Sequence, residues 1–265
     1  MINEVLLQKR KGNVGTLIIN RPEKKNSITP EILLKLYIVL NEWAKEGSIR
    51  TVIITGSGNT AFSSGYDISA LPTDLSPEMS ELLKKENPLD LATRSLKNFP
   101  YPIIAMINGY AFGAGVHIAM CCDIRIGSDD ILIGMPPAKL GIVYFPEGLK
   151  LFVDILGMSR TREIFFTGHT YKGQEAKEMG FVNHLIPKSK LLTSTYSLAE
   201  EIAGNSPLSL KGIKKILNML ENSTKFSESN LKEAEAIIQE AFTSNDLKEG
   251  QTAFFEKRKP VFSGS

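Results

Sequence analysis

One short segment constrains the fold of this chain more than any other, because an apolar run, a glycine-rich turn and an apolar helix follow directly on one another. Residues 103–107 are typical of a buried strand, glycines crowd residues 109–115, and residues 116–122 continue as an apolar helical stretch. A glycine turn that opens a helix leaves backbone N–H groups uncovered at the positive end of the helix dipole. The segment therefore predicts an anion-binding turn, for either a phosphate or an oxyanion that forms in a transition state.

The rest of the chain indicates an α/β architecture. Thr29 followed by Pro30 is a helix start signal, and apolar residues then repeat at helical spacing as far as Ala44. Strand and helix patterns alternate up to about residue 190, and only helical patterns follow. A polar stretch over residues 71–88 is expected to be the most mobile part. The expected strands cover residues 14–20, 51–55, 103–107, 124–126, 131–133 and 182–186, and the expected late helices cover residues 191–203, 207–220 and 228–242.

Composition narrows the functional classes. A formal charge of +2 over 265 residues argues against a nucleic-acid-binding protein, which usually has a concentrated basic face. Cys121 and Cys122 are adjacent in an apolar helix, so we expect buried thiols rather than a disulfide. The three histidines form no metal-binding pair, and no apolar run reaches the length of about 18 residues that a membrane span needs. We therefore expect a cytoplasmic protein without a metal site or a membrane partner.

Four blocks of the sequence carry a family resemblance, and they are residues 20–26 (NRPEKKN), 62–68 (FSSGYDI), 108–123 (NGYAFGAGVHIAMCCD) and 254–260 (FFEKRKP). In their order and spacing they resemble the crotonase (enoyl-CoA hydratase/isomerase) superfamily. The resemblance implies an α/β spiral of ββα turns over residues 1–190 and a C-terminal helical trimerisation region over residues 191–265. It also implies homotrimers or dimers of trimers, an acyl-CoA thioester as substrate and no cofactor beyond the coenzyme A of that thioester.

The resemblance also assigns residues to the site. A thioester enolate needs two N–H donors aimed at one oxygen, and by the family pattern these are the backbone groups of Tyr66 and Ala114. Asp67 has a simpler interpretation as a cap of its local backbone. The residues that the resemblance places near coenzyme A are Lys24, Lys25, Ser64, Asp67, Ile68, and, from a neighbouring subunit, Phe254 with Lys257.

Two departures from the family pattern argue against a typical hydratase. Hydration needs a water held between two acid/base groups, commonly two glutamates in this family. His117 occupies the position of the first glutamate and Pro137 that of the second. Because proline cannot transfer a proton, both members of the hydratase pair are missing.

The pattern is most similar to that of the methylmalonyl-CoA decarboxylases, on residues 65–68, 137–144 and 256–260. Loss of CO2 from a β-carboxyl thioester forms the enolate directly, so that no base has to abstract a proton from carbon. We expect Tyr144 or Tyr66 to orient the departing carboxylate, and His117 to act as the acid. The alternatives are that Tyr144 is only a wall of the pocket and that His117 is a packed, neutral histidine.

Glu147 supports a different reaction. Some family isomerases move a proton between two carbons with a single carboxylate placed shortly after the Leu-Gly step, which predicts Δ3–Δ2 enoyl-CoA isomerisation through Glu147. Its alternative role is to complement the dipole at a helix start beside Gly148. The remaining hypotheses are an atypical hydratase and a non-catalytic acyl-CoA-binding protein that has lost its glutamates.

Overall fold

The computed structural model describes residues 4–67, 87–221, 242–258 and 260–261, together with residues 232, 235, 236 and 239. Ile68 and nearly all of the polar stretch over residues 71–88 lie outside the described residues. The chain divides into two compact units. The first comprises residues 1–133 and 171–220, and the second comprises residues 134–170 and 221–265.

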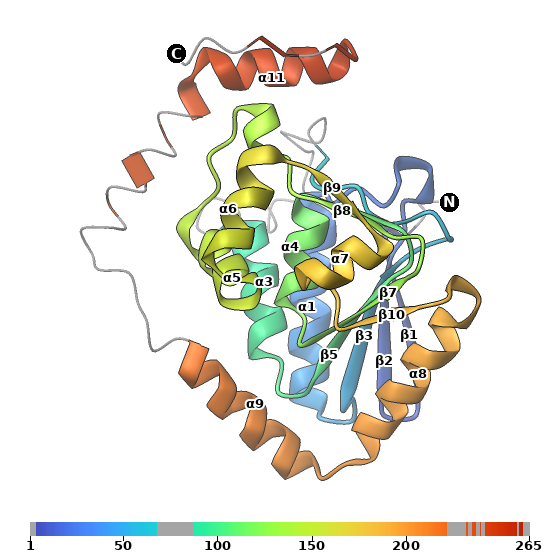
Figure 1. Ribbon diagram of the computed structural model, residues 1–265. Coiled ribbons are helices and arrows are strands. Elements are labelled where there is room, and N and C mark those ends of the chain that lie inside the picture. The colour runs from blue at the N-terminus through green and yellow to red at the C-terminus, as the bar shows by residue number, and fades with distance from the viewer. Residues whose placement is uncertain are drawn as a thin grey trace. The chain divides into compact units, whose positions relative to one another are not determined.

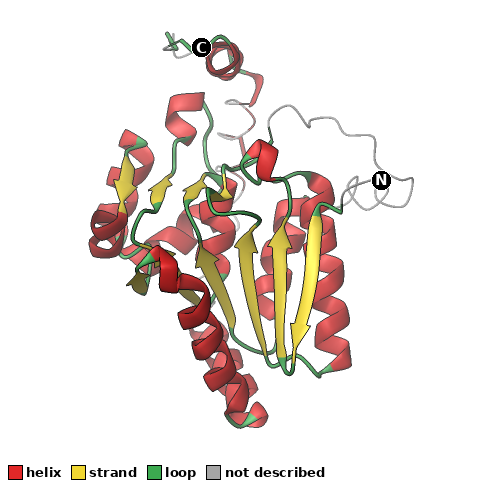
Figure 2. Ribbon diagram, turned by 90° about the vertical axis from the view of Figure 1, so that its right-hand side faces the viewer, coloured by secondary structure: helices red, strands yellow, loops and turns green. Residues whose placement is uncertain are grey.

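A six-stranded sheet is the centre of the first unit (Figure 2). Its order is β1-β2-β3-β5-β7-β10, in which β1 runs antiparallel to β2 and the other neighbours are parallel. Near-continuous apolar runs form β3 and β5, as expected for strands that are covered on both faces. The bounds are β1 (Leu6–Lys11), β2 (Val14–Ile19), β3 (Thr51–Gly56), β5 (Ile103–Ile107), β7 (Ile124–Ser128) and β10 (His184–Ile186).

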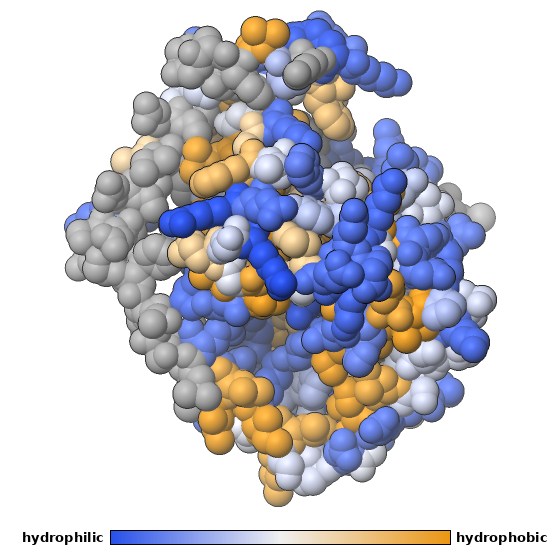
Figure 3. All heavy atoms as spheres, viewed as in Figure 1, coloured by the Kyte–Doolittle hydropathy of each residue, from blue (hydrophilic) through white to orange (hydrophobic). Residues whose placement is uncertain are grey.

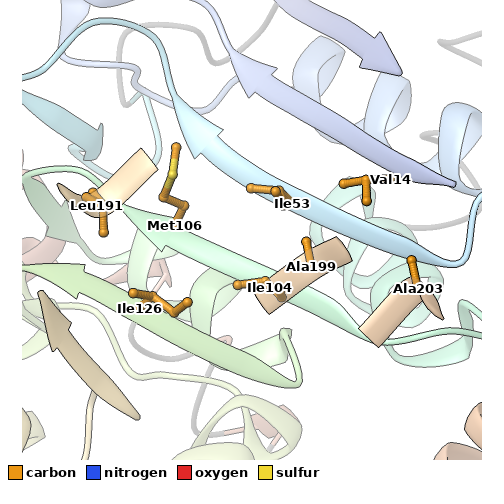
Figure 4. Packing of buried hydrophobic residues seen from close by; sticks show 8 residues of the cluster. All are labelled: Val14, Ile53, Ile104, Met106, Ile126, Leu191, Ala199 and Ala203. Carbon is orange, nitrogen blue, oxygen red and sulfur yellow. The ribbon is translucent and has the colours of Figure 1, made fainter. Parts of the chain in front are cut away.

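Helices cover both faces of this sheet. On one face lies α1 (Pro30–Glu46), where Trp43 packs so closely on β2 that a Cβ at Gly15 would stand 2.2 Å from its ring. On the other face lies α8 (Lys188–Gly204), which packs in one apolar cluster with side chains of β2, β3, β5 and β7 (Figure 4). The members of that cluster are Val14, Ile53, Ile104, Met106, Ile126, Leu191, Ala199 and Ala203.

A second sheet, of order β4-β6-β8-β9, positions the glycine turns. Its strands are β4 (Ala61–Ser63), β6 (Tyr110–Phe112), β8 (Leu132–Gly134) and β9 (Thr170–Lys172). The first two are parallel and pair Ala61 with Tyr110. A glycine turn follows each of these two strands, and α4 (Ala114–Cys121) begins directly after the second. The helix α3 (Pro88–Asn98) packs against both α1 and α4.

The last helix of the first unit is α9 (Pro207–Glu221), which is fixed by a buried lysine. Lys214 donates to Tyr101 O at 3.0 Å and pairs with Asp123 Oδ2 at 2.7 Å, so a buried ammonium is matched by oxygens. An apolar strip of the same helix is exposed, at the lower left of Figure 3. The strip consists of Leu208, Ile213, Ile216 and Leu217.

The second unit is helical and has its own aromatic core. Its elements are η3 (Pro137–Leu140), α5 (Pro146–Leu156), α6 (Met158–Thr167) and α11 (Asn245–Phe255). Figure 1 shows α5 and α6 side by side, and Phe152 meets Phe165 between them with ring centroids 5.0 Å apart. The helix α11 packs on η3, where a Cβ at Gly250 would stand 2.5 Å from Leu140 O.

The structure confirms most of the expected elements. The strand over residues 103–107 has the predicted bounds, and Thr29 caps α1 with its hydroxyl accepting from Ile32 N at 3.4 Å. Both cysteines are buried thiols. The sequence missed β1, β4, β6, β9, α3, α6, α7 (Gly173–Met179) and α11, while most of the helix expected over residues 228–242 lies outside the described residues. The boundary near residue 190 and the trimerisation role of residues 191–265 remain predictions, and α8 packs in the first unit.

Candidate active site

Two glycine turns of the first unit meet backbone to backbone. Gly65 has φ +103° and Gly113 has φ +51°, conformations that favour glycine. A Cβ at Gly65 would stand 3.0 Å from Phe112 O and 3.7 Å from Ala114 N, and one at Gly113 would stand 3.9 Å from Gly65 Cα. The parallel pair β4 and β6 therefore delivers both turns to one place, and a side chain at Gly65 would crowd the backbone there.

The peptide groups of the first turn have a defined orientation. Gly65 O accepts from Ile28 N at 2.8 Å, and Asp67 N donates to Ile28 O at 2.8 Å. In a trans peptide the C=O and N–H point in opposite directions. Because Gly65 C=O points toward Ile28, the N–H of Tyr66 in the same peptide points away from it. The side chain of Tyr66 is partly buried, and that burial raises its pKa above the usual value of 10.0.

The second turn opens α4. Its helical bonding begins with His117 N donating to Gly113 O at 3.0 Å, so the N–H of Ala114 precedes the intrahelical ladder. The positive end of the helix dipole lies at the same place. Two N–H groups in adjoining turns are the backbone elements that an enolate oxygen requires. The roles of Tyr66 and Ala114 remain predictions that this arrangement favours.

A polar network ties the first turn to the preceding loop. Arg21 Nη1 lies 2.9 Å from Asp67 Oδ2 and also donates to Ser27 O at 3.1 Å. The side chains of Arg21 and Asp67 are only 19% and 12% exposed. Asp67 therefore pairs with a residue 46 positions away, and its role as a local cap stays a prediction.

Three of the residues that were expected to bind coenzyme A gather beside this turn. Ser64 N donates to Lys25 O at 2.9 Å, and Ser64 Oγ donates to Lys24 O at 3.3 Å. The ammonium of Lys25 stands 5.5 Å from the centroid of the Tyr110 ring. Two lysines next to a turn can meet phosphate groups, and this role stays a prediction.

The other residues expected to contact coenzyme A are not placed beside this turn by the described residues. Phe254 is an exposed residue of α11, and Lys257 follows that helix with φ +54°. Both belong to the second unit. Ile68 lies outside the described residues.

His117 is buried in the first turn of α4, 1% exposed. Burial, with a smaller effect of the Lys97 charge, lowers its pKa from 6.5 to about 4. The ring is therefore neutral at neutral pH, and the role of His117 as the acid remains a prediction. Its Nε2 lies 3.3 Å from Thr93 Oγ1 of α3. Sequence reasoning missed Thr93, because nothing in the sequence relates a helix residue to a histidine 24 positions further on.

Tyr144 and Glu147 belong to the second unit. Tyr144 stacks on Phe145 with ring centroids 4.7 Å apart and lies 5.3 Å from the Phe165 ring. Glu147 is exposed in the first turn of α5, where its charge complements the helix dipole as expected for a helix start. A Cβ at Gly148 would stand 2.5 Å from Tyr144 Cε1, so any larger residue would displace the tyrosine ring. The catalytic roles of Tyr144 and Glu147 remain predictions.

Neither a metal site nor a membrane-spanning helix is found among the described residues. Among them, no group of three or more His, Cys, Asp or Glu side chains is placed to hold a metal ion. No helix within the same ranges is long and apolar enough to cross a membrane.

Comparisons with known proteins give the class of protein. The Enoyl-CoA hydratase/isomerase family model matches residues 9–265. A putative enoyl-CoA hydratase/isomerase of Bacillus subtilis is 30% identical over 268 residues, with 100% of both chains covered. The short-chain-enoyl-CoA hydratase of Clostridium acetobutylicum is 32% identical, with 97% of each chain covered.

Solved structures agree with the sequence comparisons. The chain is similar to methylmalonyl-CoA decarboxylase complexed with 2S-carboxypropyl CoA, with a TM-score of 0.89, 28% identity and 100% of both chains covered. An enoyl-CoA hydratase/isomerase from Pseudoalteromonas atlantica gives a TM-score of 0.85 at 25% identity, with 98% of this chain and 100% of that chain covered. The chain therefore has the crotonase fold and belongs to the enoyl-CoA hydratase/isomerase family. It is an enzyme that acts on an acyl-CoA thioester.

Proposed function

We propose that this enzyme decarboxylates a β-carboxyl acyl-CoA through a thioester enolate. The observation that carries the proposal is His117, a buried and neutral histidine in the first turn of α4, at the position where a hydratase of this family has a glutamate. The likeness to a methylmalonyl-CoA decarboxylase over the whole chain supports it.

The proposed reaction uses the backbone of the two turns. The bond between the α-carbon and the carboxylate breaks, CO2 leaves, and the electron pair moves into the thioester carbonyl. The enolate oxygen then accepts from the N–H groups of Tyr66 and Ala114, which stabilise it more than the neutral carbonyl that precedes it. A proton from solvent completes the new C–H bond, so the balanced products are the shorter acyl-CoA and CO2.

The neutral state of His117 suits this chemistry. A cation near the substrate would stabilise the carboxylate, whose charge is lost from that position in the transition state, and would slow the reaction. A neutral ring in a buried place avoids that penalty. Tyr144 remains the candidate for orienting the carboxylate through its phenol hydroxyl.

A panel of thioesters tests the proposal. Purified protein is incubated with malonyl-, methylmalonyl- and ethylmalonyl-CoA, and both CO2 and the shorter acyl-CoA are quantified. We expect turnover of at least one ester, and a loss of turnover in Tyr144→Phe with folding unchanged. Failure on every ester would remove the proposal.

A second candidate is hydration or isomerisation of an enoyl-CoA, because the sequence relatives at 30% and 32% identity carry those names. It predicts that crotonyl-CoA is hydrated or that a 3-enoyl-CoA gains the absorbance of a conjugated enoyl thioester. Glu147→Gln should abolish the isomerisation, since a single carboxylate would carry the proton. An unaffected variant removes the isomerase assignment.

A further inference from the structure

Thr93 connects α3 to the histidine of the candidate site. Its Oγ1 lies 2.7 Å from Leu89 O, one turn earlier in the same helix, and 3.3 Å from His117 Nε2. His117 is buried and Thr93 is partly buried, so the two side chains meet in the packed contact between α3 and α4. The hydroxyl is thus placed between a carbonyl and an imidazole.

The position of the protons follows from this placement. A threonine hydroxyl has one hydrogen to donate, and a carbonyl oxygen can only accept. The Thr93 hydroxyl therefore donates its hydrogen to Leu89 O, the shorter of the two contacts. Toward His117 the same oxygen presents a lone pair, and the 3.3 Å contact is a hydrogen bond only if Nε2 carries a hydrogen.

We propose that Thr93 is a positioning residue that fixes His117 as the tautomer with its proton on Nε2, so that Nδ1 is the ring atom that accepts a hydrogen bond. The meaning of this for catalysis rests on the proposed decarboxylation. Because the ring is neutral at pH 7, its only N–H is committed to Thr93. In this tautomer the ring has no further N–H to donate, so the proton for the enolate comes from water rather than from the ring.

The proton balance of this last step is closed by solvent. The O–H bond of the water breaks as the C–H bond forms. The hydroxide that remains combines with CO2 to give bicarbonate or takes a proton from bulk water. No base or oxidant beyond the protein and water is required.

NMR of the full-length protein with ¹⁵N-labelled histidine tests the proposal without substrate. The chain has only three histidines, His117, His169 and His184, and His117→Gln identifies the signals of His117 by difference. At pH 7 we expect the wild-type ring to show a protonated Nε2 and an unprotonated Nδ1. Thr93→Val, which has the same shape without the hydroxyl, should let the other tautomer appear, and Thr93→Ser should restore the wild-type spectrum.

A matched control lies two residues further along α3. The Ser95 hydroxyl also donates to its own helix, to Ala92 O at 2.7 Å. Ser95→Ala removes a buried hydroxyl of the same kind, and we expect it to leave the signals of His117 unchanged. An altered tautomer in this variant would show that the spectrum reports general loosening of α3 and would overturn the role of Thr93.

Kinetics give the second readout. With an ester that turns over, Thr93→Val should lower kcat by about tenfold, equivalent to about 1.4 kcal/mol, and leave KM almost unchanged. A wild-type ring protonated on Nδ1, or a Thr93→Val ring identical to the wild type, would overturn the inference. Because the NMR spectra need no substrate, a lack of decarboxylation would remove the proposed function alone.

Discussion

The two glycine turns of the first unit carry equivalent candidate N–H groups but are held in different ways. The first turn is fixed by polar bonds, from its backbone to Ile28 and from Asp67 to Arg21. The second is fixed by close packing, since a Cβ at Gly115 would stand 2.7 Å from Ser63 Cβ. A change of charge should therefore disturb the first turn, and a change of volume should disturb the second.

The largest effect is expected from Ala114→Pro. Proline is compatible with the first position of a helix, so the variant removes one N–H while α4 can still form. If this N–H stabilises the enolate, kcat should fall by about 10²- to 10³-fold. Turnover of the best thioester and the Tm are measured together.

The matched control is Met158→Pro, which also puts proline at the first position of a helix, α6. Met158 is 52% exposed and its replacement should leave turnover unchanged. Activity of Ala114→Pro close to the wild-type value would mean that the second turn supplies no oxyanion donor.

The next largest effect is on stability and concerns His117, the buried histidine in the first turn of α4. Its folded-state pKa of about 4 lies below the unfolded value of about 6.5, so protons bind the unfolded chain more strongly between these values. The free energy of unfolding is therefore highest above pH 6.5 and should fall by up to about 3 kcal/mol as the pH decreases to 4. Urea unfolding at pH 7.0 and at lower pH measures it.

The comparison variant is His117→Gln, which cannot titrate in this range. It should lose this part of the pH dependence, whatever the change in its free energy of unfolding at pH 7. Equal pH dependence in both proteins would show that His117 titrates in the same way in the folded and the unfolded chain.

Sequence patterns predicted the elements that are long and apolar. The bounds of β5 and the Thr29 cap of α1 follow from an uninterrupted apolar run and from a capping residue before proline. The missed strands have no such signal. β4, β6 and β9 are three residues each, too short for a period to show. β1 lies at the sheet edge, and its four exposed residues give the pattern of a charged surface rather than of a strand.

The candidate site was predictable only where it depends on local sequence. Glycine at positions 65 and 113 marks the turns, and residue 117 stands out because a histidine replaces the expected glutamate. The contact of Thr93 with His117 depends on how α3 packs on α4, and the Arg21–Asp67 pair bridges 46 positions. Such contacts between distant segments leave no periodicity in a single sequence.

A smaller effect is expected when volume is added to the second turn. Gly115→Ala places a methyl group 2.8 Å from Ser63 O, a backbone atom that cannot move away cheaply. The cost should be about 1–3 kcal/mol in the free energy of unfolding. Urea unfolding measures it against Gly212→Ala, a helix glycine of α9 with nothing within 4 Å of the added Cβ.

The Gly212→Ala control should be neutral or stabilising by about 0.4–1 kcal/mol, because alanine restricts the unfolded chain and favours the helix. If Gly115→Ala is no less stable to urea than this control, close packing does not hold the second glycine turn in place.

The smallest effect is expected from Asp67→Asn, which removes the charge of the first turn and keeps its shape. The pair with Arg21 is mostly buried, so the cost should lie between those of exposed and fully buried pairs, at about 1 kcal/mol in the free energy of unfolding. The matched control is Glu31→Gln, whose exposed pair with Lys35 spans one helical turn and should contribute about 0.2–0.5 kcal/mol. Because the backbone bonds to Ile28 remain in Asp67→Asn, kcat should fall by less than in Ala114→Pro. A larger fall would mean that the charge pair, rather than the backbone ladder, orients the N–H of Tyr66.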